Sequence, residues 1–508
     1  IGNPNDWKGA YRPSETMSRN IDRVAPTKEI AAATKDFVIG NKVQAEAKYR
    51  TEVQTEYNAL GKRIDEVTSA RPKSVSKKQY DDDVFAVLNG DKTDADIRKA
   101  YDKPVADAIL KYKTETRALY DNLLERINNE RVKFGQAPIG RRNDYITHLQ
   151  ELSGDQKFTG EVYNAVKNSF TDDGMARTRG GVPASISGRT ENFKPVSAWN
   201  KYLQERKGTS SLRDPYKAVE AYIEPALYNI HMTESTVRAR ALESAFRTAD
   251  EIARLSPENA AKEAGSILKQ YSGQQGNAKM TDGLAEYANA LARKTQRTDR
   301  QILDMSQSTA LGLRGWQQLQ RIGGRGTILG NASSVLAQPL NQGVGIADAG
   351  VANWFKGIAK TIGGDDAIKQ SPFITARRTK ADAPLRSKGE KVLDAGGYAL
   401  QEAEYASIKI IWNSQHAKAL QAGKKGMEAI READYNTERL VAGRGIADKP
   451  ELYRSTLANG FLQYTLEVNA QWKAVMKDFT PKQKVTFAVA ALGINTVMGA
   501  VTGFEPLP

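Results

Sequence analysis

The sequence is poor in the residues that build metal centres and covalent cross-links. Its 508 residues include no cysteine and only three histidines, His148, His231 and His416. Without thiols the chain can form no disulfide, no thiolate metal site and no cysteine nucleophile, so packing must hold the fold together. The histidines are too far apart in sequence to form the metal-binding pair of an HExxH helix. We therefore expect no metal site and assign each histidine a structural or surface role.

Motifs for nucleotide binding and hydrolysis are missing as well. The chain contains neither GxxxxGK[ST] nor GxSxG, and its glycine-rich phrase RIGGRGTILG follows a helical stretch rather than a strand. Carboxylate pairs such as Asp365 with Asp366 lie in polar stretches, where solvated charge is the ordinary role. The sequence therefore predicts no enzyme and no cofactor in this chain.

Aromatic residues make up only 8% of the chain, whereas Ala, Gln, Lys and Arg are abundant. This composition favours long helices over sheets. We expect an all-α fold, an elongated multi-helix assembly with long helices, irregular basic connectors and no substantial sheet. Lys and Arg outnumber Asp and Glu by 74 to 60, which predicts attraction to polyanions such as DNA or an anionic membrane surface.

Hydrophobic periodicity predicts where the helices lie. Long helices are expected over 28–68 and 94–134, and the second has Val105, Ile109, Tyr112, Leu119, Leu123 and Ile127 on one stripe, followed by Gly135 as a stop signal. The two should form an antiparallel pair. Asp214 and Pro215 predict a helix start, and Pro225 should kink that helix. Further helices are expected over 233–255, 257–271, 282–293, 299–319, 392–422, 425–441 and 457–479.

Two stretches are basic and lack acidic balance. Residues 175–213 hold eight Lys or Arg against two Glu, and residues 305–347 hold three Arg and no acidic residue. Such segments suit phosphate contact, although a solvated linker is the alternative for the first and a buried helix broken near Pro339 for the second. The candidates for nucleic-acid contact are Arg177, Arg179, Arg189, Arg314, Arg321, Arg325, Arg377 and Arg378.

Near the end of the chain lies an uncharged, mostly apolar run of 20 residues, from Val485 to Phe504. Its length matches a bilayer core, but its Ala, Gly and Asn content also fits a buried helix at an oligomer interface. An aromatic stripe over 457–479 precedes it, and Gly499 with Gly503 forms a GxxxG spacing that allows close helix approach. The candidates for membrane or oligomer contact are Phe461, Tyr464, Trp472, Phe479, Phe487, Leu492, Gly499 and Gly503.

These patterns divide the chain into five regions. They are an N-terminal long-helix region (1–138), a basic loop-rich connector (139–213), a central helical domain (214–325), a C-terminal helical domain (326–456), and an amphipathic helix with a hydrophobic tail (457–508). The apolar stripes without an obvious partner predict a homo-oligomer.

Four phrases resemble the large, helix-rich internal virion proteins of tailed bacteriophages, often called polyvalent or ejection proteins. They are IGRRNDYITHL from Ile139, in which Thr147 replaces the usual Pro, RDPYKAVEAYIEPALYNIHM from Arg213, LGNASSVLAQPLNQ from Leu329, and the block from Ser407 to Ser455 with its phrase EAIREAD. The last is the most convincing, because such a block precedes an aromatic helix and an apolar tail in relatives. The resemblance covers roughly residues 139–508.

The resemblance implies a protein that is packaged inside the virion and then delivered with the DNA into the host cell envelope, where it helps build a channel or tunnel. The implied partners are further copies of the chain, other ejection, portal or tail proteins, phage double-stranded DNA bound without sequence preference, and the host membrane. It implies no catalysis in this segment. The alternatives are a static internal structural protein and the scaffold segment of a longer, enzyme-carrying polypeptide.

Overall fold

The structure is a computed structural model. It describes residues 14–135, 138–140, 149–151, 193–195, 213–254, 280–292, 342–378, 388–441, 445–450 and 473–502, together with positions 7, 11, 12, 146, 470 and 471. Within these residues the fold is all-α, as the composition predicted. The one sheet among them is a two-stranded antiparallel ribbon of β1 (Leu149–Glu151) and β2 (Phe193–Pro195), in which Gln150 pairs with Lys194.

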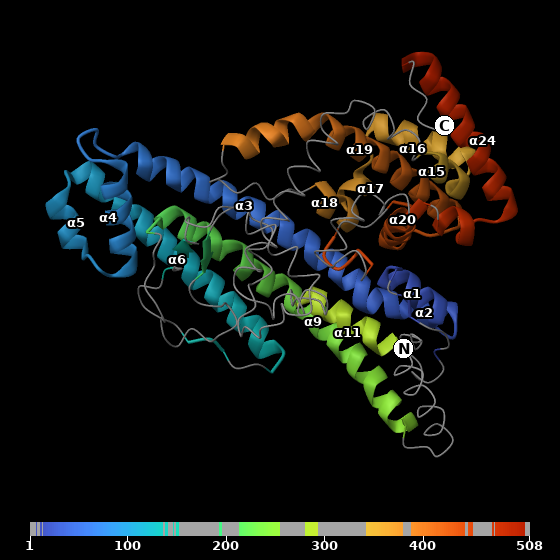
Figure 1. Ribbon diagram of the computed structural model, residues 1–508, viewed down its shortest axis with the longest axis horizontal. Coiled ribbons are helices and arrows are strands. Elements are labelled where there is room, and N and C mark those ends of the chain that lie inside the picture. Colours follow the sequence, from blue (N-terminus) through green and yellow to red (C-terminus); the bar gives the residue numbers. More distant parts are fainter. Residues whose placement is uncertain are drawn as a thin grey trace, which may run out of the picture.

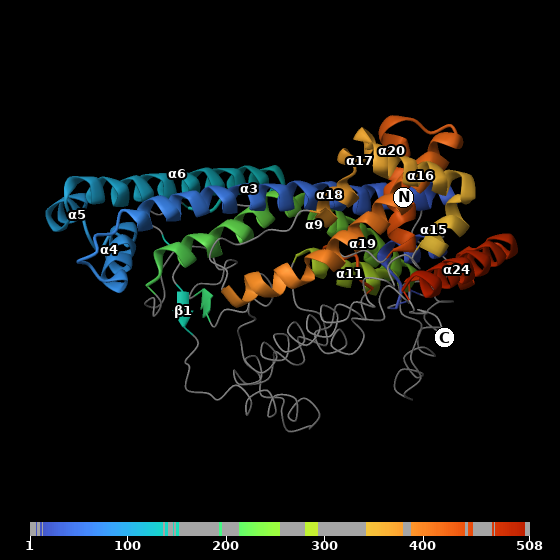
Figure 2. The same ribbon diagram turned by 90° about the horizontal axis from the view of Figure 1, so that it is seen from above.

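The first group of helices forms what we call the N-terminal body. Its elements are α1 (Met17–Val24), α2 (Lys28–Lys35), a π-helical turn (Asp36–Gly40), α3 (Asn41–Ser69), α4 (Lys77–Asn89), α5 (Asp94–Ala100), α6 (Lys103–Lys133), α9 (Pro215–Arg254) and α11 (Met280–Leu291). Helices α3 and α6 run side by side in opposite directions, joined by α4 and α5 at one end of the elongated molecule (Figures 1 and 2). The antiparallel pair predicted from the sequence is therefore present.

The second group forms the C-terminal body. Its elements are α15 (Gln342–Ala349), α16 (Val351–Gly363), α17 (Asp366–Lys369), α18 (Pro372–Arg378), α19 (Lys388–Gln421), α20 (Gly426–Leu440), a second π-helical turn (Ala474–Asp478) and α24 (Pro481–Thr502). Helix α19 is its centre and contacts α15, α16 and α20. The expected helices over 392–422 and 425–441 correspond to α19 and α20.

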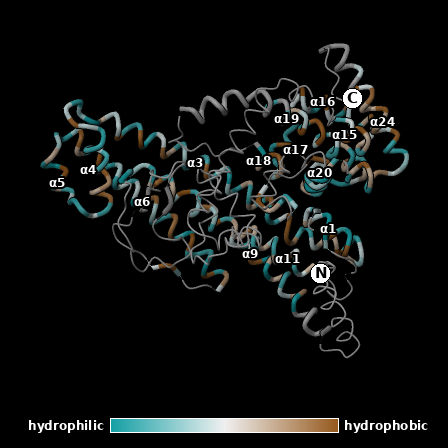
Figure 3. Tube along the Cα trace, in the orientation of Figure 1, coloured by the Kyte–Doolittle hydropathy of each residue, from teal (hydrophilic) through white to brown (hydrophobic). Residues whose placement is uncertain are grey.

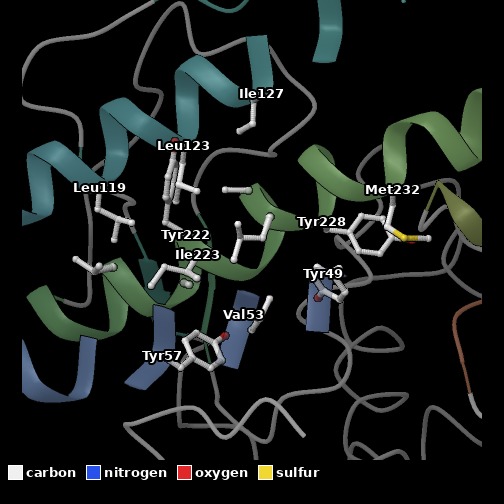
Figure 4. Packing of buried hydrophobic residues seen from close by; sticks show 14 of the residues in the cluster. Tyr49, Val53, Tyr57, Leu119, Leu123, Ile127, Tyr222, Ile223, Tyr228 and Met232 are labelled. Carbon is white, nitrogen blue, oxygen red and sulfur yellow. The ribbon is translucent and has the colours of Figure 1, made fainter. Parts of the chain in front are cut away.

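The core of the N-terminal body lies where α9 packs against both α3 and α6. Tyr49, Val53 and Tyr57 of α3 lie on one side of α9, near Ile223 and Tyr228, while Tyr222 points to the other side, where Leu119, Leu123 and Ile127 of α6 lie (Figure 4). Aromatic rings pack against one another here: the rings of Tyr49 and Tyr228 meet edge-on at 5.4 Å, and those of Tyr120 and Tyr222 lie 4.0 Å apart. The stripe predicted for residues 105–127 is thus buried against α9, with Val105 at its partly buried edge.

Helix boundaries follow local chemistry. The carboxylate of Asp214 accepts hydrogen bonds of 3.0 Å from the amides of Tyr216 and Lys217, which confirms the predicted start of α9. Pro225 lies inside this single 40-residue helix, which also includes the helix expected over 233–255 up to Arg254. Gly135 has a φ of 70° after the end of α6, the left-handed conformation that suits a helix stop.

Two expected helices are interrupted. The helix over 28–68 contains the π-helical turn Asp36–Gly40, and the helix over 94–134 breaks at Tyr101 and Asp102. Pro104 explains the second break, because it fits only the first turn of a helix and so begins α6 rather than continuing α5. The expected helices over 257–271 and 299–319, and the break near Pro339, lie outside the described residues.

Candidate functional site

The two bodies meet where α18 packs against α3, and many charged pairs surround this contact. Among the described hydrophobic residues, Val43 is the one that packs, partly buried, against both hydrophobic cores. Around it, α1, α2 and the start of α3 bind α20 and the π-helical turn before Phe479 through polar pairs. We call this surface the charged seam. Its pairs include Arg19 with Asp478 (2.9 Å), Lys477 with Glu15 (2.8 Å), Arg431 with Asp36 (3.2 Å) and Tyr435 with Asp22.

The centre of the charged seam is a buried group of ions around Lys42. The Lys42 side chain has 0% of its surface exposed, and its ammonium group pairs with Asp448 and lies 3.4 Å from Glu46. Arg50 donates hydrogen bonds of 2.9 and 2.7 Å to the other oxygen of Glu46, while the Ile446 amide donates one of 2.9 Å to the first. Every oxygen of Glu46 is therefore satisfied although the side chain is buried, as a buried charge requires.

The backbone around Asp448 is shaped to let it reach Lys42. A Cβ on Gly445 would lie 2.6 Å from a Glu46 oxygen, so only glycine permits this close approach. Ala447 adopts a φ of 61°, which L-residues rarely do, and packs its side chain on the core of the N-terminal body. The segment 445–450, which follows α20, thus crosses the charged seam in a strained conformation.

The balance of charges in this group determines which of its carboxyl groups carries a proton. Three carboxylates, those of Glu46, Asp448 and Glu438, share two cations, Lys42 and Arg50. Burial and the negative charge of Asp448 raise the pKa of Glu438 to about 8, so Glu438 carries a proton at neutral pH. Burial and the negative charge of Glu46 also raise the pKa of Asp448, against the opposing effect of Lys42. Lys42 and Arg50, in turn, hold the pKa of Glu46 below its usual range in spite of burial.

A second ionic group ties α20 to the rest of the C-terminal body. Asp348 of α15 accepts hydrogen bonds from Arg439 (2.6 Å) and Lys418 (3.0 Å), and Arg439 also reaches Asp478 at 3.3 Å. Nearby, burial raises the pKa of Asp434 to about 6, although Ser371 and the Trp412 indole N–H donate to it at 2.5 and 2.6 Å. Arg439 therefore belongs both to the C-terminal body and to the charged seam.

The N-terminal body also carries a polar cleft of about 480 Å³ between α3, α6 and α9. His231 and Arg126 meet there on the carboxylate of Glu52, at 2.6 Å from the imidazole Nε2 and 2.9 Å from a guanidinium nitrogen. These hydrogen bonds, first that from His231, hold the pKa of Glu52 at about 2. The exposed Lys48 and the pair of Lys133 with Glu234 also line the cleft. Acidic side chains pair with most of the cations that line the cleft. The cleft is therefore a junction of three helices with little net charge.

The arginines predicted to contact nucleic acid are mostly outside the described residues. Arg177, Arg179, Arg189, Arg314, Arg321 and Arg325 are in that group. Arg377 lies on α18, where its guanidinium pairs with Glu404 at 2.9 Å and is 9% exposed. Arg378 is the last residue of α18. The charge of Arg377 is therefore neutralised by Glu404 within the fold.

The candidates for membrane or oligomer contact are distributed over different environments. Phe479 is buried in the core of the C-terminal body, and Phe487 of α24 packs beside Gly343 of α15. Leu492 is 64% exposed on α24, and Gly499 lies near the end of that helix. Phe461, Tyr464, Trp472 and Gly503 lie outside the described residues. Nowhere in the described part of the chain is a helix both long and apolar enough to cross a bilayer.

The sequence alone did not predict the contacts between the residues that the structure brings together most closely. Lys42 and Asp448 are 406 positions apart, and Glu52, Arg126 and His231 come from three helices. The i, i+4 spacing of Lys42 and Glu46 was visible, but it is also the pattern of any exposed helical pair. His416 is buried beside the Trp412 ring, and His148 lies outside the described residues. In the described ranges, no cluster of three or more His, Asp or Glu could hold a metal ion.

Comparisons with protein-family models, with curated proteins and with solved structures find no match to this chain.

Proposed function

We propose that the chain is an internal virion protein of a tailed bacteriophage, ejected with the genome and assembled with further copies of itself into a channel or tunnel in the host envelope. Its other partners would be ejection, portal or tail proteins, double-stranded DNA and the host membrane. The proposal rests on the resemblance of four sequence phrases and on one structural observation, the charged seam between two helical bodies.

The charged seam supports delivery for a physical reason. A protein that passes through a narrow tail must give up its tertiary structure and recover it afterwards. Helices re-form quickly because their contacts are local, and the absence of cysteine removes covalent cross-links. The ion pairs of the charged seam can separate readily, because water solvates the parted charges. The charged seam is therefore a suitable place for the first step of disassembly.

Contact with packaged DNA is the electrostatic part of the proposal. The formal net charge of +14 favours a polyanion without demanding a sequence-specific site. DNA retardation by the purified chain should weaken steeply as the salt concentration rises. Binding that stays constant from low to high salt would contradict this part alone.

The location of the protein before and after genome release tests the proposal. Quantitative mass spectrometry should find the chain in intact virions of the encoding phage, find it depleted in particles emptied of DNA, and recover it from the envelope fraction of newly infected cells. A capsid protein that remains in emptied particles provides the control. If the chain stays in emptied particles, it is a static internal protein and the delivery proposal fails.

A further inference from the structure

Helix α16 buries small and polar residues most deeply and leaves large apolar side chains exposed. Its buried residues are Asn353 and Gly357, whereas Phe355 is 61% and Ile362 83% exposed. Val351, Phe355 and Ile362 follow one another at spacings of four and seven, which places them on a single stripe. A surface helix ordinarily does the opposite, so this stripe needs an explanation outside the described contacts of the fold.

Specific contacts hold α16 in this orientation. A Cβ on Gly357 would lie 2.3 Å from the Ser414 hydroxyl, so the helix rests directly on α19 through its glycine. The Asn353 amide donates to Gln421 at 2.9 Å, and the Asn413 amide of α19 donates to the Thr361 hydroxyl at 2.9 Å. The outward face is thus fixed by hydrogen bonds and close packing on the inward one.

A second apolar stripe lies on α24, the helix on the other side of α15 (Figures 1 and 2). Val485, Val489 and Leu492 are all exposed and follow one another at steps of four and three. Figure 3 shows the apolar character of α24 at the same end of the molecule as α16. The two helices together contain four lysines and no acidic residue. Among the described residues, Lys356 and Lys482 have no acidic partner, while Lys360 pairs with Asp365.

We propose that the outward stripes of α16 and α24 form a docking surface for an anionic lipid bilayer, which the two helices enter side-on without crossing it. Apolar side chains beside lysines are what an interfacial helix presents to acyl chains and anionic headgroups. Trp354, half-buried with its indole donating to Gln342 at 2.9 Å, meets the Phe355 ring edge-on at 5.2 Å and supports it from the inner side.

Charge argues against a second copy of the chain as the occupant. A twofold interface would bring the same lysine-bearing, acid-free helices of two copies face to face. Like charges would then oppose each other, whereas anionic headgroups would neutralise them. The bilayer-docking surface rests on the proposed function, because it is the part of the chain that would meet the host membrane. Its test needs only the purified chain.

The test is sedimentation of the purified chain with vesicles of phosphatidylglycerol and phosphatidylcholine in equal parts, compared with vesicles of phosphatidylcholine alone. We expect binding to the anionic vesicles that weakens with salt. The double variant Phe355→Glu and Ile362→Glu should reduce partitioning by about tenfold or more, because two side chains no longer enter the acyl boundary. Val132→Glu, which charges a 59% exposed apolar residue on α6, is the matched control and should bind as the parent does.

Circular dichroism and light scattering without lipid accompany each variant, to show that the fold and the oligomeric mass are those of the parent. Failure of the parent to bind anionic vesicles, or equal binding by the double variant, overturns the proposal. A third outcome also overturns the proposal: the parent forms an oligomer, the double variant dissociates it, and lipid binding stays unchanged. That result would assign the surface to a second copy of the chain. Fractionation of virions and infected cells is a separate result, so either proposal can fail alone.

Discussion

The ammonium group of Lys42 on α3 pairs with the carboxylate of Asp448, a residue that follows α20 and lies 406 positions further along the chain. Neither group has appreciable access to water, and each is the main counter-charge of the other. This pair lies at the centre of the charged seam, so the stability of the contact between the two bodies depends on it.

Replacing Lys42 with Met should destabilise the protein by about 3–5 kcal/mol, because it leaves Glu46 and Asp448 buried with only Arg50 to compensate them. Urea denaturation followed by circular dichroism measures the change. Lys48→Met is the matched control, since Lys48 lies on the same helix with an exposed side chain, and it should shift the free energy of unfolding by less than about 0.5 kcal/mol. Similar effects from the two variants would contradict the role of Lys42.

Glu438→Gln should stabilise the protein at alkaline pH. The folded state raises the pKa of Glu438 from 4.5 to about 8, so the folded protein holds a proton that the unfolded chain releases. Its stability is therefore lost as the pH rises from 4.5 through 8, and glutamine avoids this loss. We expect equal free energies of unfolding near pH 4.5 and a variant more stable by roughly 1–3 kcal/mol above pH 8. A difference that does not vary with pH would contradict the assignment.

Glu52→Gln should have the opposite pH dependence. Because the folded pKa of about 2 lies below the ordinary 4.5, the stabilisation from Glu52 is present above pH 4.5 and is lost as the pH falls from 4.5 to 2. At pH 7 the variant should be less stable by about 1–3 kcal/mol, and near pH 2 the two proteins should converge. Glu66→Gln, which removes an exposed pair with Lys111, should change stability by less than about 0.5 kcal/mol at either pH.

Gly357→Ala should loosen α16 from α19. The added methyl group would lie 2.3 Å from the Ser414 hydroxyl and 2.7 Å from the Ile410 carbonyl oxygen, which is a fixed backbone atom. We expect a loss of about 1–3 kcal/mol in the free energy of unfolding. Gly363→Ala is the control on the same helix, because no atom lies within 4 Å of its Cβ position, and it should be neutral or slightly stabilising. Equal effects would show that helix propensity, not packing, decides the outcome.

Local signals in the sequence were enough to predict the fold class and most long helices. Asp214 with Pro215 marked the start of α9, and the stripe from Ile109 to Ile127 marked the buried face of α6, since capping and periodicity act within a few residues. The breaks at Asp36–Gly40 and Tyr101 were missed. The π-helical turn at Asp36–Gly40 depends on an inserted residue in the hydrogen-bond ladder of the helix. The break at Tyr101 depends on Pro104, and the surrounding periodicity outweighed that proline in the prediction.

The charged seam and the outward face of α16 could not be predicted in the same way. Lys42 and Asp448 meet only because α3 and the segment after α20 pack together, and nothing near either residue in the sequence signals the partner. The sequence of α16 has an ordinary amphipathic pattern, from which a buried apolar face would be expected. Its orientation is decided by the contacts of its Gly357 and Asn353 with α19, which the local pattern does not reveal.

The delivery proposal requires the two bodies to separate along the charged seam before either one unfolds. Because the chain has no cysteine, Val132→Cys on the N-terminal body and Met427→Cys on the C-terminal body, both exposed, can carry a fluorescent donor and acceptor. During a urea titration, we predict that energy transfer between them falls at a lower urea concentration than the helical circular dichroism. A single transition, with both signals changing together at every pH and salt concentration, would contradict the account.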